Sequence, residues 1–148
     1  MDRWDLAGSD TELLMEILDE GGKKTGLSAI LGKAEKGLSM KLPRALLERM
    51  GFNKGKVDIR PWFIKEPNEL GCGAIALFLS WAGEGALRIG YALAKIKEAS
   101  ELQLLSREGI EKVMKENSKS LIELPAAELD LDKAAEPLEV IMESLEFE

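Results

Sequence analysis

The sequence predicts an α+β fold, in which helices pack on a small, mostly antiparallel sheet within a single domain. Three observations lead to this prediction. The chain has 148 residues, of which 45% are hydrophobic, enough for one core of ordinary size. Several segments repeat apolar residues at the spacing of a helix, and a few shorter ones alternate apolar and polar residues as a strand does. We expect the single domain to span residues 1–132, followed by an acidic amphipathic segment over residues 133–148.

Two helices are expected near the amino terminus. Ser9 and Glu12 have the spacing of a capping box, which satisfies backbone N–H groups at a helix start. Gly21 and Gly22 would end this helix, and a second one is expected over residues 25–36. The apolar residues that predict them are Leu13, Leu14, Ile17 and Leu18 in the first helix, and Leu27, Ile30, Leu31 and Ala34 in the second.

A strand, a helix and another strand are expected next. Residues 39–42 suit a short strand, and Pro43 suits the first turn of a helix that ends at Gly51. Residues 57–63 then alternate. Because Pro61 cannot donate to a β-ladder, we expect this strand at a sheet edge or with a bulge. Its apolar face would hold Val57, Ile59 and Phe63, and its polar face Asp58, Arg60 and Trp62.

The second half of the chain is predicted to be mainly helical. Residues 74–97 suggest two apolar helical pieces hinged near Gly83 and Gly85, with a strand over residues 74–80 as the alternative. Short strands are expected over residues 101–105 and 120–124, and Ser106 would cap the helix between them.

The last segment predicts an amphipathic helix. Its apolar residues recur at intervals of three and four, and glutamates occupy the remaining face. Such a helix could pack on its own core or on another chain, so we expect self-association as a dimer or higher oligomer, or a protein partner at this helix. The apolar residues are Leu138, Ile141, Met142 and Leu145.

The composition argues against several chemistries. The chain has no histidine and one cysteine, Cys72, which removes the common zinc ligand sets and every triad with an imidazole base. The 27 acids leave a carboxylate site for Mg²⁺ or Ca²⁺ possible, but no residue pattern predicts a metal site, a cofactor or catalytic residues. Nothing in the sequence supports an enzyme, which stays open as a third hypothesis, as does whether Cys72 is reactive. With no second cysteine for a disulfide and no apolar leader, the expected location is cytoplasmic. The longest apolar stretch, residues 72–83, is too short to cross a bilayer, so no membrane contact is expected.

Charge is distributed unevenly along the chain. The net charge is −7, yet residues 23–65 hold eleven lysines and arginines against three acids, a net +8. We call these residues the basic block. Residues 101–148 carry a net −8, so this acidic end could bind a partner or cover the basic block of its own chain.

Within the basic block, residues 39–60 combine a strand, a Leu42-Pro43 helix start, a Met50-Gly51 stop, a Lys54-Gly55 turn and a Val-Asp-Ile strand. This order resembles half of the swapped-hairpin DNA-binding motif of the AbrB/MazE type. The resemblance implies an intertwined dimer that presents Lys41, Arg44 and Arg60 to DNA. The chain departs from the family after Ile59, where Pro61, Trp62 and Phe63 replace a further hairpin strand.

Cations attract phosphates without regard to sequence, and an aromatic ring can stack on a base. The sequence therefore predicts a nucleic-acid-binding protein, for DNA or a single strand, with a protein-interaction module or a subunit of a larger complex as the alternative. The predicted nucleic-acid-binding residues are Lys41, Arg44, Arg49, Lys54, Lys56, Arg60 and Trp62.

Overall fold

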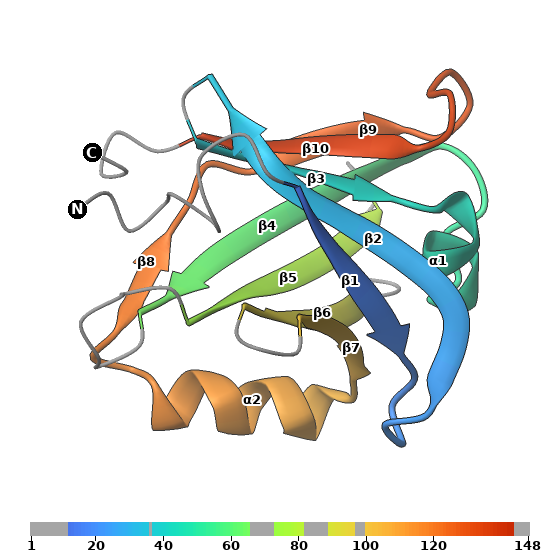
Figure 1. Cartoon of the computed structure of the whole chain (residues 1–148). Helices are drawn as coiled ribbons and strands as arrows, with labels where there is room; N and C mark the ends of the chain where they lie inside the picture. Colours follow the sequence, from blue (N-terminus) through green and yellow to red (C-terminus); the bar gives the residue numbers. More distant parts are fainter. Residues whose placement is uncertain (1–11, 36, 66–72, 82–88, 97–99, 144–148) are drawn as a thin grey trace.

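The protein is mostly β-structure rather than the predicted α+β arrangement, with ten strands and two helices in the part of the chain that the computed structural model describes (Figure 1). The described residues are 12–35, 37–65, 73–81, 89–96 and 100–143. In chain order the elements are β1 (Leu13–Leu18), β2 (Lys24–Ala34), β3 (Gly37–Leu42), α1 (Arg44–Arg49), β4 (Lys56–Ile64), β5 (Ala74–Trp81), β6 (Ile89–Lys95), β7 (Glu101–Leu105), α2 (Arg107–Glu116), β8 (Leu121–Glu123), β9 (Ala127–Asp130) and β10 (Leu138–Glu143).

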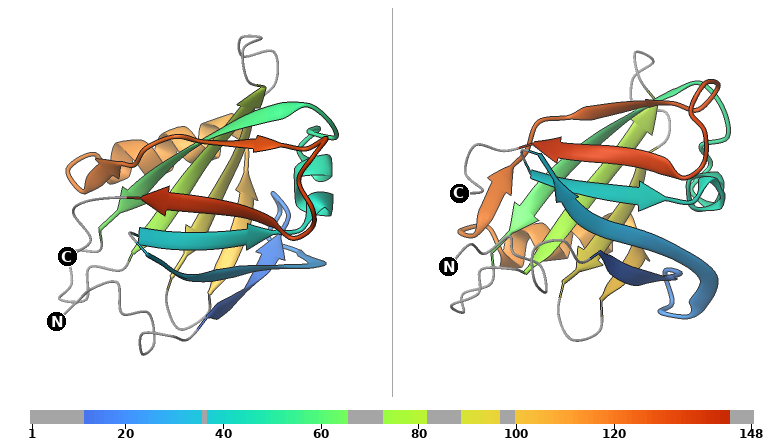
Figure 2. Two further views of the ribbon diagram at one scale, coloured as in Figure 1. Left: turned by 90° about the horizontal axis from the view of Figure 1, so that it is seen from above. Right: turned by 45° about the horizontal axis from the view of Figure 1, so that its top comes forward.

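The strands form one sheet in the order β10-β3-β2-β1-β7-β6-β5-β4-β8, and β9 also pairs with β4. Neighbouring described strands are antiparallel except β1 and β7, which run parallel. The sheet curls until β9 and β10 come into contact, so the strands surround a common interior (Figure 2). The result is an open barrel.

The interior of the barrel is filled by every second residue of each strand, as the two-residue period of a strand requires. Met15 and Ile17 of β1 point inward, as do Leu138 and Val140 of β10, and all four are at most 2% exposed. Phe52, fully buried, follows α1 at one end of the barrel, where its ring meets that of Trp81 edge to face at 5.1 Å between centroids.

A second, smaller core lies outside the barrel, where α2 packs on β6 and β7 and shares a cluster of apolar side chains with β4 and β5 (Figure 1). Ile110 of α2 is 1% exposed and is grouped there with Ile64, Ala76 and Leu93. Strands β5 and β6, which α2 covers in part on their outer face, are apolar along most of their length. Among the described residues, no helix is both long and apolar enough to cross a lipid bilayer.

The two helices predicted near the amino terminus are wrong: those residues form β1 and β2, joined by a tight turn. Asp19 Oδ1 accepts hydrogen bonds from the N–H groups of Gly21 and Lys23, each at 2.9 Å, and Gly22 adopts a φ of 84°. Both features favour a hairpin turn over a continued helix. The capping residue proposed at Ser9 lies outside the described residues.

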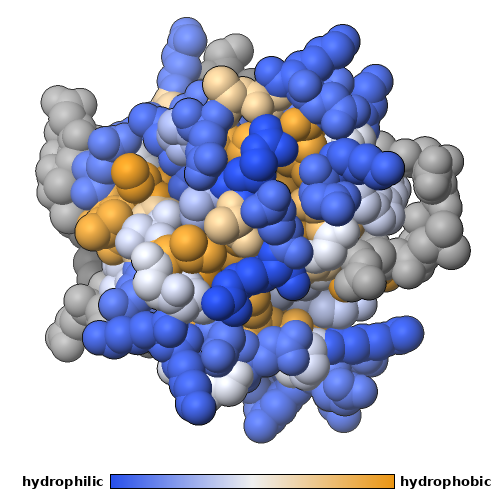
Figure 3. Space-filling model, turned by 90° about the vertical axis from the view of Figure 1, so that its right-hand side faces the viewer, coloured by the Kyte–Doolittle hydropathy of each residue, from blue (hydrophilic) through white to orange (hydrophobic). Residues whose placement is uncertain are grey.

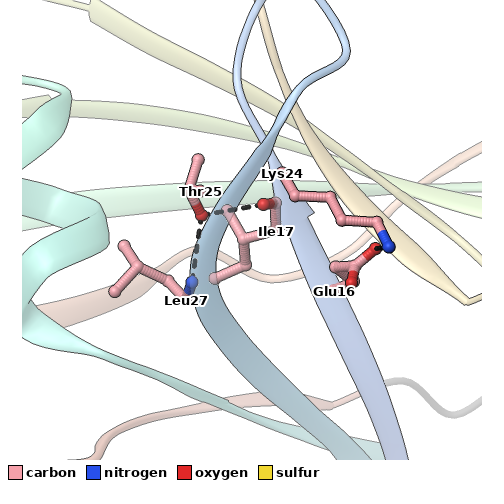
Figure 4. A network of polar contacts seen from close by, with 5 residues as sticks. All are labelled: Glu16, Ile17, Lys24, Thr25 and Leu27. Atoms are coloured by element: carbon pink, nitrogen blue, oxygen red, sulfur yellow. Dashed lines mark hydrogen bonds and ion pairs between the residues drawn. The ribbon is translucent and has the colours of Figure 1, made fainter.

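Polar contacts hold β2 against β1 beyond this turn (Figure 4). The Thr25 hydroxyl donates to the Ile17 carbonyl at 2.8 Å and accepts from Leu27 N at 3.1 Å, at a shift in the strand register. Lys24 lies 3.6 Å from a Glu16 carboxylate oxygen.

The helical predictions for residues 74–97 and for the carboxy-terminal segment are also wrong. Residues 74–97 contain β5 and β6, so the alternative strand over residues 74–80 is confirmed, and the hinge glycines lie outside the described residues. The final segment forms β10, which pairs with β3 along its whole length. Residues 138–143 are therefore part of the barrel wall and not an amphipathic helix, and Leu145 lies outside the described residues.

The strand of residues 57–63 forms as predicted but is not at an edge, because β4 pairs with β5 on one side and with β8 and β9 on the other. The carbonyl of Pro61 accepts from Leu124 N at 3.1 Å. A strand residue directs its N and O to the same side, so the missing N–H of Pro61 faces the break between β8 and β9.

Five other predictions are confirmed: strands at β3, β7 and β8, and helices at α1 and α2. Ser106 caps α2 by accepting from Gly109 N at 3.1 Å.

Candidate functional site

An open groove of about 450 Å³ lies on the outer face of β4, β5 and β6 and is the candidate functional site. Its position follows from the alternation of the strands, because residues on the outer face cannot enter the barrel core. α2 covers one part of this outer face, and the groove occupies the part beside it. We refer to it as the β4–β6 groove.

The register of the strands places the lining residues in rows that run across the sheet. Arg60 of β4 stands opposite Phe78 of β5, which stands opposite Tyr91 of β6. The Phe78 and Tyr91 rings pack edge to face, with centroids 5.6 Å apart. The neighbouring row toward the end of β5 runs Asp58, Ser80 and Ile89.

Trp62 stands one row further along β4, on the side of α2, with Glu123 of β8 beside it. The indole ring is partly buried because it packs on the outer core with α2. Ile89, at the other side of the groove, is 41% exposed. The groove therefore has an aromatic floor with one exposed apolar side chain, Ile89, at its side.

Three charged side chains reach the groove: Asp58, Arg60 and Glu123. Within the described part of the chain, none of them makes a hydrogen bond or an ion pair. The groove thus offers five guanidinium N–H donors and two carboxylates to a ligand, at a net charge of −1.

Of the seven predicted nucleic-acid-binding residues, the structure brings only Arg60 and Trp62 into the groove. Arg49, Lys54 and Lys56 are exposed at the end of the barrel near α1. Hydrophilic side chains there stand around small, separate hydrophobic areas (Figure 3). None of these three cations lines the groove, although Lys56 is on the same face of β4 as Asp58, two residues away.

The remaining two predicted residues already have partners in the chain. Lys41 lies on the outer face of β3, with its Nζ 3.5 Å from Glu12 Oε2. The Arg44 guanidinium donates to the Ala134 carbonyl at 2.8 Å, and Arg44 N donates to Glu136 Oε2 at 3.2 Å. In the curled sheet, β10 and β9 lie between β3 and β4.

The acidic end of the chain lies against elements of the basic block. Strand β9 pairs with β4, so Asp130 stands opposite Lys56 and Glu128 opposite Asp58. Asp132 Oδ1 also accepts from Gly55 N at 3.1 Å. The positive charge that is concentrated in the sequence is consequently interleaved with carboxylates in space.

The sequence did not identify Phe78 and Tyr91 as site residues, because both fall in the stretch interpreted as buried helix. The alternation of residues 57–63 correctly predicted that Trp62 shares a strand face with Asp58 and Arg60. All three side chains line the groove.

Comparison with family models, with curated proteins and with solved structures finds no match to this chain.

Proposed function

We propose that this protein is a binding module that holds a segment of a partner protein in the β4–β6 groove. The observation that carries the proposal is the gathering of Trp62, Phe78, Tyr91 and Arg60, whose guanidinium has no partner among the described residues, at one concave, accessible place. Tryptophan, tyrosine and arginine are the residue types in which the binding energy of protein interfaces is most often concentrated.

The polar groups of the groove fit a polypeptide partner. A peptide backbone alternates donors and acceptors, so it can use both the Arg60 guanidinium and the carboxylates of Asp58 and Glu123. The rings already pack against each other and against α2, so little side-chain freedom remains to be lost on binding.

The proposal is tested by selecting peptides from a random library displayed on phage, using the intact protein as bait. Selected peptides should lose about thirtyfold in affinity on Tyr91→Ala or Arg60→Ala, as truncating an interface hot spot of about 2 kcal/mol requires. Arg60 is exposed, so its truncation leaves the core intact.

Leu14→Ala is the matched control for the selection. Leu14 is 69% exposed on β1, away from the groove, and its truncation should leave affinity unchanged. A library that yields no binders, or binders equally tight to the Arg60 and Tyr91 variants, contradicts the proposal.

Single-stranded nucleic acid is the second candidate ligand, favoured by the position of Arg60 next to Trp62 on β4. A guanidinium beside an aromatic ring can hold a phosphate while a base stacks. Filter binding of a thymidine oligonucleotide at two salt concentrations tests it. Affinity that falls steeply with salt, and that drops in Lys54→Ala, Lys56→Ala and Arg60→Ala, would favour this candidate over the peptide.

A further inference from the structure

The β4–β6 groove also carries information about the chemistry of its occupant, and this inference rests on the function proposed above. The Arg60, Phe78 and Tyr91 row forms the middle of the floor. Asp58 lies on one side of that row, and Glu123 lies on the other, beside Trp62. An apolar floor is thus flanked by a carboxylate at each side.

The spacing of the two rows that carry the carboxylates matches a short extended peptide. Side chains on the same face of a strand are about 6.5–7 Å apart, so the rows of Asp58 and Trp62 are about 13 Å apart. Glu123 is in register with Trp62 on the neighbouring strand β8, on the side of β4 away from Phe78 and Tyr91. An extended peptide covers the same distance in four residue steps, so its positions i and i+4 would reach the two carboxylates. Position i+2 would lie at the middle row, next to Arg60 and beside Phe78.

The charge around the groove favours cations at those two positions. Both carboxylates are without partners in the described part of the chain, and Glu128 of β9 stands opposite Asp58, while Asp130 stands opposite Lys56 and offsets its charge. The whole chain carries a net charge of −7, which attracts a basic partner and repels an acidic one. Arg60, between the two carboxylates, can donate to the backbone carbonyls of the occupant.

We infer that the β4–β6 groove selects an extended basic segment of a partner protein, in which lysine or arginine at positions i and i+4 flanks a large apolar residue at i+2. The cations pair with Asp58 and Glu123, and the apolar side chain packs on Phe78, Tyr91 and Trp62.

Three synthetic peptides of equal length test this specificity, with the central sequences Lys-Gly-Phe-Gly-Lys, Glu-Gly-Phe-Gly-Glu and Lys-Gly-Gly-Gly-Lys. Binding to the full chain is followed by NMR titration of backbone amides. The first peptide should bind about tenfold or more tightly than either of the others, and it should shift amides of β4, β5 and β6.

The double variant Asp58→Asn/Glu123→Gln should reduce binding of the first peptide about tenfold. The matched control is Glu20→Gln/Glu116→Gln, which removes the same charge from two exposed sites away from the groove and should change affinity less than about twofold. Rescue of the second, acidic peptide by the groove variant would further support the pairing.

Equal losses in the two double variants would show only general attraction between a basic peptide and an acidic protein, and would overturn the inference. Selection of acidic or uncharged library peptides that still depend on Tyr91 would also overturn it, while leaving the proposed function intact. Tighter binding of the thymidine oligonucleotide than of all three peptides would overturn both.

Discussion

Gly90 occupies a position in β6 where a side chain has almost no room. A Cβ atom there would lie 2.9 Å from Met50 Sδ and 3.1 Å from a ring carbon of Phe52. The methionine sulfur can move, but the buried phenylalanine ring at the end of the barrel has less freedom to do so.

We predict that Gly90→Ala lowers the free energy of unfolding by about 1–3 kcal/mol, the usual penalty for overpacking a core. Urea denaturation followed by tryptophan fluorescence measures it. Gly21→Ala is the control, because a Cβ there meets only Asp19 Oδ1 at an ordinary 3.5 Å. Equal stability of the two variants would show that Met50 and Phe52 do not pack as closely against Gly90 as described.

At the scale of the element, the carboxy-terminal strand shows why short apolar runs mislead. In β10, Leu138, Val140 and Met142 are buried and Ile141 is 40% exposed. The helical prediction placed Leu138, Ile141 and Met142 inside. Both patterns are present in the same six residues, and the pairing of β10 with β3, which depends on residues about 100 positions away, decides between them.

The strand and the helical pattern predict opposite orders of stability for substitutions at Val140 and Ile141. Val140→Thr buries a hydroxyl in the barrel core and should cost about 1–3 kcal/mol of stability, whereas Ile141→Thr, half in solvent, should cost about 0.5 kcal/mol or less. Chemical denaturation of the two variants compares them directly. A larger loss of stability for Ile141→Thr than for Val140→Thr would contradict the strand and agree with the helical pattern.

Elements with their own local signals were predictable from the sequence. Pro43 begins α1, Ser106 caps α2, and the alternation of residues 57–63 gives β4. Strands β1, β2, β6 and β10 were expected as helices, and β5 as a strand only in the alternative. They are apolar runs in which helical and strand spacing coincide, and some of them are buried on both faces. The short strand β9 was not predicted. The identity of these strands comes from long-range pairing, which leaves little trace in any one segment.

The candidate site was predictable to the same extent. Trp62 and Arg60 were found because one strand places them on one face, a local property. Phe78, Tyr91 and Glu123 join them only through the pairing of β4 with β5 and β8 and of β5 with β6. The cations of the basic block, by contrast, are close together only along the sequence. In the folded barrel, carboxylates lie between them.

At the scale of the whole molecule, backbone hydrogen bonds join every pair of neighbouring described strands except β9 and β10. Strands β4, β5 and β6 have partners on both sides, whereas β9 and β10 meet without a β-ladder between them in the described chain. Backbone N–H groups on the open side of β10 therefore rely on solvent, while those of β5 are bonded into the sheet.

Amide hydrogen exchange should reveal the missing β-ladder between β9 and β10. Along β10, protection should alternate from one residue to the next, because only every second N–H points toward β3 in an antiparallel pair. Along β5 every amide should be protected, since its two neighbours between them accept from both sides. NMR exchange measured at several pH values distinguishes the two patterns. Uniform slow exchange throughout β10 would mean that hydrogen bonds between β9 and β10 close the barrel. Local unfolding would then not begin between these two strands.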